Sequence, residues 1–290
     1  MSQLSLGDLP SEAGVPVPSA ADVSAPSAAD EVPEFVDDST TSSRVLKLTI
    51  AYDGTGFRGF AAQVEQRTVE SALSEALARV LRSPVKLTCA GRTDSGVHAW
   101  GQVVTLPIAD DADIDVDIVQ RSVNSQLGPE VVARVVEIVD GSFDARRSAL
   151  WRSYRYTIVN RPVADPFLAR HAWWVSEPLD LKLLRLGADP FLGTHDFVSF
   201  CRRGPEGSTT MRRVFDSSWH DLGDGVLRYD VRASAFCWRM VRSMVGTLVD
   251  VGAGKLTPGD VLRILRARNR AESSDPAPAR GLCLWEVGYP

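Results

Sequence analysis

Two kinds of hydrophobic pattern alternate along the first half of the folded body. Residues 45–52 alternate apolar and polar side chains, as a half-buried strand does, and residues 69–81 repeat apolar side chains at helical spacing behind a capping Thr68. Six elements are predicted: strand 45–52, helix 69–81, strands 85–90 and 102–106, helix 116–127 and strand 131–139. The order β-α-β-β-α-β is that of a ferredoxin-like unit.

The second half of the body repeats this order. Its predicted elements are strand 152–160, helix 181–192, strands 214–219 and 226–233, helix 236–251, a helix opening at Thr257 with Pro258 in its first turn, and strand 283–287. We therefore predict an α+β protein of two ferredoxin-like halves, residues 44–143 and 144–290, with antiparallel or mixed sheet flanked by helices. A cleft between such halves is a natural place for an active site.

Residues 1–43 show neither period and are rich in Ala, Ser, Pro and Asp, so they predict a disordered acidic tail. The chain carries a net charge of −5, but this tail holds eight acids and no Lys or Arg. Without it, 32 bases face 29 acids, a net charge of +3. The body is mildly basic, and local patches decide whether it can bind a polyanion.

Several classes of protein are disfavoured by composition. No apolar run approaches the roughly 18 residues that span a bilayer, and the N-terminus lacks the pattern of a secretory signal. The four cysteines are scattered and form no Cys-x-x-Cys pair, so neither a zinc site nor a disulfide framework is expected. We expect a cytoplasmic protein with reduced thiols, no membrane partner and no metal.

The run at 90–98 reads Ala-Gly-Arg-Thr-Asp-Ser-Gly-Val-His and lies between two predicted strands. Asp94 has two interpretations. It can simply form a tight turn, which Asp and Gly favour. It can also be catalytic, because the nearby Arg92 favours an ionised carboxylate and a glycine-bounded loop can project it into a cleft as a nucleophile. His98 is expected to make a structural hydrogen bond or a minor substrate contact.

Two further segments mix basic and aromatic residues. Residues 146–156 interleave them, as surfaces that hold unstacked bases do, although Tyr154 and Tyr156 share one strand face and could equally be core. Residues 236–242 open the long predicted helix. There Arg239 and Arg242 lie on one side and could be solvated or meet phosphates.

A dinucleotide-binding motif also matches, at Gly54-Thr55-Gly56-Phe57-Arg58-Gly59. That motif requires a helix that begins within the glycine loop, yet eight residues separate the loop from Thr68. A nicotinamide oxidoreductase is therefore disfavoured. The glycines are better explained by a flexible loop that approaches a ligand closely.

With these motifs in order, the chain resembles the tRNA pseudouridine synthase A family. The resemblance rests on the 90–98 run followed by Gly101-Gln102-Val103, on Arg152-x-Tyr154-Arg155-Tyr156, on Ala235-Phe236 with Met240-Val241-Arg242, on Gly281-Leu282, and on Tyr52-Asp53-Gly54. The chain departs from the family at Gly59-Phe60-Ala61, where Gly-Trp-Gln is common, and at residues 124–128, where Asn-x-x-Leu-Pro is common.

The resemblance implies isomerisation of uridine to pseudouridine at positions 38 to 40 of the tRNA anticodon stem-loop, with no cofactor. Asp94 would be nucleophile or base. Arg92 would pair with it and help flip the target base. Tyr154 would stack on the uracil and could help remove its C5 proton, and Leu282 would wall the pocket. Arg242, Arg155 and His98 are further candidate contacts to the tRNA.

The resemblance also implies a homodimer in which one tRNA contacts both subunits. An alternative is a non-catalytic RNA-binding protein of tandem ferredoxin-like modules. That alternative explains the basic and aromatic strand but gives Asp94 no purpose, and it predicts aromatic side chains on adjacent central strands.

Overall fold

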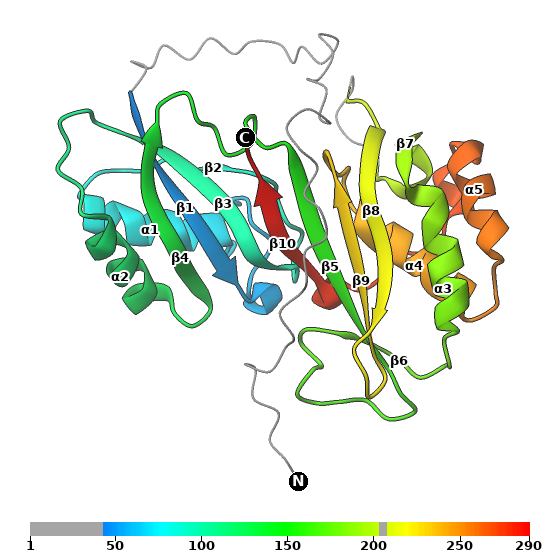
Figure 1. Ribbon diagram of the computed structural model, residues 1–290. Coiled ribbons are helices and arrows are strands. Elements are labelled where there is room, and N and C mark those ends of the chain that lie inside the picture. Colours follow the sequence, from blue (N-terminus) through cyan, green and yellow to red (C-terminus); the bar gives the residue numbers. More distant parts are fainter. Residues whose placement is uncertain (1–42, 203–207) are drawn as a thin grey trace. The chain divides into compact units, whose positions relative to one another are not determined.

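The computed structural model of the protein describes residues 43–202 and 208–290, so the predicted tail lies outside the described residues except for Ser43. In the described part, one sheet has the order β4-β1-β3-β10-β5-β9-β8-β7, with β2 paired to β3 and β6 to β5 (Figure 1). Its strands are β1 (Arg44–Tyr52), β2 (Thr88–Cys89), β3 (His98–Ile108), β4 (Val131–Asp140), β5 (Trp151–Asn160), β6 (Trp173–Val175), β7 (Gly193–Asp196), β8 (Met211–Asp221), β9 (Val226–Ala233) and β10 (Leu282–Gly288).

The sheet contains the ferredoxin-like order twice, which confirms the predicted α+β fold. In the first half the order is β4-β1-β3-β2, and in the second it is β10-β5-β9-β8, with antiparallel pairing throughout each set. Five α-helices accompany the described strands: α1 (Val69–Leu81), α2 (Val116–Leu127), α3 (Leu181–Ala188), α4 (Met240–Gly252) and α5 (Pro258–Ala267). Both sets share one sheet, so the division at residues 143 and 144 stays a prediction.

The two halves meet at the edge of β3. There β10 pairs with β3 in parallel, Cys283 beside His98 and Leu284 beside Ala99. Further along the same edge, β2 pairs through Thr88 and Cys89 only. One strand edge accepts one neighbour at a time, so beyond Ala90 the chain cannot follow this edge towards His98, and it leaves the sheet. The strand predicted at 85–90 is also shorter at its other end, since β2 begins only at Thr88. Residues 90–97, the Asp94 loop, therefore lie where the halves join.

Gly101 makes this junction possible. A Cβ atom built on Gly101 would lie 2.4 Å from the carbonyl oxygen of Trp285 and 3.2 Å from the Cα of Glu286. Both obstacles are backbone atoms of β10, which cannot swing aside as a side chain can. The close approach of β3 and β10 therefore requires glycine.

Helix ends follow the sequence signals in two cases and depart from them in two. Thr68 begins α1 with a capping box, and Thr257 with Pro258 begins α5 as predicted. The helix predicted at 236–251 starts only at Met240, because Arg239 has a left-handed backbone (φ 63°). The helix predicted at 181–192 ends at Ala188 and tightens into a 3-10 turn that contains Pro190, since proline has no N–H to donate to the carbonyl four residues earlier. Strands β6 and β7 were not predicted because they are three and four residues long.

The glycine loop does not fit a dinucleotide site. It forms the short 3-10 turn Gly54–Gly56, and α1 begins far beyond it at Val69. Strand β1 is antiparallel to both of its neighbours, whereas the dinucleotide fold uses parallel strands. None of the helices in the described residues is long and apolar enough to cross a membrane.

Replacing Gly101 by Ala should destabilise the protein through the β3–β10 junction. We expect a loss of about 3 kcal/mol in the free energy of unfolding, because the new methyl group meets fixed backbone. The matched control is Gly259→Ala in the first turn of α5, where the nearest atom lies 3.8 Å away and Ala favours the helix. Chemical denaturation measures both; equal stabilities of the two variants would contradict this account of the junction.

Candidate active site

Backbone hydrogen bonds and small contacts fix the Asp94 loop within the first half. The amide of Phe60 donates to the carbonyl of Thr93 (3.0 Å), and the hydroxyls of Tyr52 and Thr93 share a hydrogen bond of 2.7 Å. Gly59 has φ 96°, and a Cβ there would lie 2.9 Å from the Thr93 carbonyl oxygen. The glycine loop thus packs against the Asp94 loop, and its residues Arg58, Gly59 and Phe60 line the same cleft. The close approach of this loop to a ligand stays a prediction.

A second set of hydrogen bonds ties the start of the loop to both halves. Gln102 of β3 donates through Nε2 to the carbonyl of Gly91 (2.6 Å). Arg152 of β5 donates through Nη2 to the carbonyls of Ala90 and Arg146 (both 2.9 Å). Burial lowers the pKa of Arg152, but a guanidinium stays charged at neutral pH. Arg152 therefore holds the first residue of the loop from the other half of the sheet.

Asp94 is held by three donors, and none of them is Arg92. Arg242 of α4 donates through Nη1 to Oδ2 (3.3 Å), and Nε of Arg239 lies 4.0 Å from the same oxygen. Trp238 donates through Nε1 to Oδ1 (3.0 Å). The ion pair predicted between Arg92 and Asp94 is not formed among the described residues. Arg92 is exposed instead and lines the cleft.

Tyr154 and Leu282 line the wall behind Asp94. Tyr154 is 8% exposed, and its ring packs edge-on against Phe236 with centroids 5.0 Å apart. Burial raises the pKa of Tyr154, so its phenol keeps its proton at neutral pH. Its hydroxyl has no hydrogen-bond partner among the described residues. Tyr156, by contrast, is fully buried and donates to the carbonyl of Pro278 (2.8 Å), as a core residue does.

A cleft of about 950 Å³ surrounds Asp94 and takes residues from both halves of the sheet, as predicted. Its lining includes Asp94, Tyr154 and Leu282, with Phe236 and Trp238 from the segment before α4. The cleft is strongly basic. Among the described residues, Glu70 and Asp94 are its acids, and seven arginines line it: Arg58, Arg92, Arg146, Arg152, Arg212, Arg239 and Arg242.

Two predicted site residues, Arg155 and His98, lie outside the cleft. Arg155 alternates with Tyr154 along β5, so it points to the opposite face of the sheet. There it stacks over Trp285 (3.8 Å from guanidinium carbon to ring centroid) and pairs with Asp230. His98 does not line the cleft. Its Nε2 faces the carbonyls of Arg170 and Arg280 (3.0 and 3.1 Å), and Nδ1 accepts from the amide of Gly54 (3.1 Å).

Among the described residues, one cluster has metal-ligand chemistry. The side chains of Asp53, His98 and His171 bring ligand atoms within 4.8 Å of one another. Both nitrogens of His98 already face backbone partners, which leaves two ligands where zinc sites use three or four. The cluster therefore ties the glycine loop to the start of β3, and it does not lie in the cleft.

Neither Trp238 nor Arg152 is selected as a site residue from the sequence. A tryptophan beside a predicted helix start is usually packing, and Arg152 was one member of a basic run. The available signals were their places in the sequence: Trp238 directly precedes Arg239, and Arg152 is the first residue of the Arg152-x-Tyr154-Arg155-Tyr156 motif. Only the sheet brings both segments to the Asp94 loop.

Comparison with known proteins agrees with this geometry. The sequence pattern of the family described as tRNA pseudouridine synthase matches residues 48–146 and 188–290. A tRNA pseudouridine synthase A from Leifsonia xyli is 42% identical over 271 residues, covering 87% of this chain and 93% of the relative. One from Brevibacillus brevis is 42% identical over 244 residues, covering 84% and 99%. One from Geotalea daltonii is 38% identical over 246 residues, covering 85% and 100%.

The chain therefore belongs to the tRNA pseudouridine synthase family. The relatives above are named as tRNA pseudouridine synthases, and the matched residues include Asp94 and Leu282 of the cleft and the segment before α4 that carries Trp238.

The His98 cluster should make the stability of the protein depend on pH. Burial, and after it the neighbouring His171, lower the pKa of His98. The folded state then binds fewer protons than the unfolded state. The contribution of His98 to the free energy of unfolding is therefore complete above about pH 6.5, the ordinary pKa of histidine, and is lost as the pH falls through the pKa of the folded state. We expect the free energy of unfolding to fall from about pH 7 to pH 5, and to fall less in His98→Asn. Urea titrations measure this; equal slopes in both proteins would rule it out.

Proposed function

We propose that this protein converts uridine to pseudouridine at positions 38 to 40 of the tRNA anticodon stem-loop. The observation that carries the proposal is the placement of Asp94. Trp238 and Arg242 donate hydrogen bonds to its carboxylate, and it lies in a basic cleft that Tyr154 and Leu282 also line. The family membership of the chain and the names of its relatives support the same reaction.

In this reaction the bond between uracil N1 and ribose C1′ breaks, the base turns, and its C5 bonds to C1′. The proton on C5 is then lost and N1 gains one, so the product is an isomer of the substrate. Asp94 acts either by attacking the sugar or by abstracting a proton from it, and a carboxylate can do both. Arg242 and Arg239 keep a positive charge beside it throughout.

The target uridine must leave its stack to reach Asp94, which costs a few kcal/mol. Arg92 stands exposed on the lining of the cleft, where it can enter the space the base vacates. Tyr154 offers a ring on which the uracil stacks, and a stack of about 1–3 kcal/mol offsets much of the flipping cost. A phenol with a raised pKa is a poor base, which favours stacking over proton removal as the role of Tyr154.

The seven arginines of the cleft explain how an acidic chain can bind tRNA. Phosphate contacts depend on local positive charge rather than on the total. We also propose a cytoplasmic homodimer, in which one tRNA contacts the clefts of both subunits, on the strength of the family resemblance alone.

A non-catalytic RNA-binding protein is the second candidate, and one observation favours it. Trp100 of β3 and Trp285 of β10 stack on adjacent central strands, with ring centroids 5.9 Å apart. However, Arg134 covers Trp100 (4.1 Å) and Arg155 covers Trp285 (3.8 Å), so these rings are already partly engaged. This candidate also leaves the three donors around Asp94 without a purpose.

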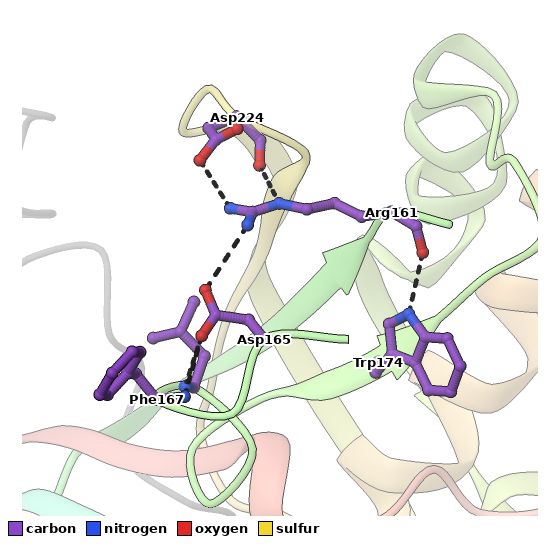
Figure 2. A network of polar contacts seen from close by, with 6 residues as sticks. Arg161, Asp165, Phe167, Trp174 and Asp224 are labelled. Carbon is purple, nitrogen blue, oxygen red and sulfur yellow. Dashed lines mark hydrogen bonds and ion pairs between the residues drawn. The ribbon is translucent and has the colours of Figure 1, made fainter. Parts of the chain in front are cut away.

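Asp94→Asn separates the two candidates. We expect pseudouridine formation in a tRNA transcript to fall at least about 1,000-fold, since the amide is neither nucleophile nor base. Binding of tRNA should change less than about tenfold, because the arginines remain. The matched control is Asp224→Asn, which should leave turnover unchanged. Asp224 is exposed, pairs with Arg161 (Figure 2) and does not line the cleft. Wild-type turnover in Asp94→Asn would exclude the catalytic role.

Variants of Tyr154 test the stacking role. Tyr154→Phe keeps the ring and should retain turnover within about tenfold. Tyr154→Leu removes the stack and should lose about 5- to 150-fold, the equivalent of 1–3 kcal/mol. Turnover by both is measured with the same transcript. If Tyr154→Phe is as inactive as Tyr154→Leu, the hydroxyl rather than the ring is required, and proton transfer by Tyr154 replaces stacking.

A further inference from the structure

Trp238 occupies an unusual place for a large aromatic residue. Its side chain is 47% exposed, yet it lies on the lining of the cleft and its indole N–H points at the carboxylate of Asp94. It belongs to the short segment between β9 and α4, outside the regular structure on either side. Exposed tryptophans are common, but one that donates a hydrogen bond to the central carboxylate of a cleft needs an explanation.

Several contacts keep the indole in this orientation. The amide of Arg202 donates to the carbonyl of Trp238 (2.9 Å), and the guanidinium of Arg202 lies over the ring, 4.2 Å from its centroid. The next residue, Arg239, adopts a left-handed backbone that non-glycine residues rarely take. Such strain persists only where the surrounding structure fixes it. The orientation of Trp238 is thus built into the segment.

The two oxygens of Asp94 consequently have different environments. Oδ2 faces the cations Arg242 and Arg239. Oδ1 faces the indole N–H of Trp238, a donor without charge. The terminal torsion of an aspartate is soft, so a carboxylate anchored at one oxygen can still rotate. With a donor at each oxygen, the plane of the carboxylate is set.

We propose that Trp238 is a positioning residue for Asp94: its indole N–H fixes the rotation of the carboxylate, so that one oxygen meets the flipped uridine in the reactive orientation. This inference rests on the proposed function. The oxygen held by the neutral donor is the one released to react, because Oδ2 is held by a charge-assisted hydrogen bond from Arg242 and by the nearby charge of Arg239, which together are stronger. A misplacement of about 1 Å in a reacting group can cost up to 100-fold in rate.

Trp238→Phe tests the proposal, because it removes the donor and keeps an aromatic ring in the same place. We expect kcat for pseudouridine formation to fall about tenfold, while KM and the dissociation constant for tRNA stay within about twofold. A lower kcat with an unchanged KM identifies a positioning role. A damaged fold would instead lower the fraction of active enzyme and also the melting temperature. Thermal unfolding of the variant should match the wild type.

The matched control is Trp174→Phe. Trp174 is 42% exposed and donates through Nε1 to the backbone carbonyl of Arg161 (2.8 Å), away from the cleft (Figure 2). The Trp174→Phe variant loses the same indole N–H donor, and its kcat and KM should equal those of the wild type.

Three outcomes would overturn the inference. An unchanged kcat with a raised KM would mean that the ring contacts RNA and does not position Asp94. A raised kcat would mean that the indole obstructs the carboxylate. An unchanged kcat and KM would mean that the hydrogen bond has no effect on the reaction. Each of these leaves the proposed function intact as long as Asp94→Asn is inactive; an active Asp94→Asn would instead remove the proposed function itself.

Discussion

The pairing of β10 with the edge of β3 is the constraint on which the site depends. Because β10 occupies that edge at His98 and Ala99, β2 ends at Cys89 and the chain must leave the sheet. The loop formed there carries Asp94 and faces strands of the second half. A single rule of sheet geometry, one neighbour per strand edge, thus creates both the junction of the two halves and the loop between them.

The junction also explains how the loop is made rigid. Donors reach it from both sides: Gln102 from β3 and Arg152 from β5. Each bonds a backbone carbonyl of the loop, so the main chain that carries Asp94 is fixed in addition to the contacts made by its side chain. A reactive group held in this way loses little entropy when the substrate arrives.

Arginine side chains have two roles around Asp94: some pair with its carboxylate, and others make the cleft basic. Arg239 and Arg242 pair with the carboxylate, while arginines such as Arg58, Arg92 and Arg146 lie further along the cleft. The guanidinium group suits both tasks, because it stays charged when half-buried and binds phosphate or carboxylate with a planar set of donors. The acidic total of the chain hides this concentration of positive charge.

The sequence by itself determined the order of elements and the repeat of the ferredoxin-like order, and it singled out Asp94, Tyr154 and Leu282, which line one cleft. Periodicity and capping are local, and each motif can be read within a few residues. Only the tertiary structure decided the partners. Asp94 pairs with residues about 145 positions away rather than with Arg92, and β-strand alternation turns Arg155 to the opposite face. Which distant side chains meet depends on strand register and on where a helix begins, and no local pattern encodes either.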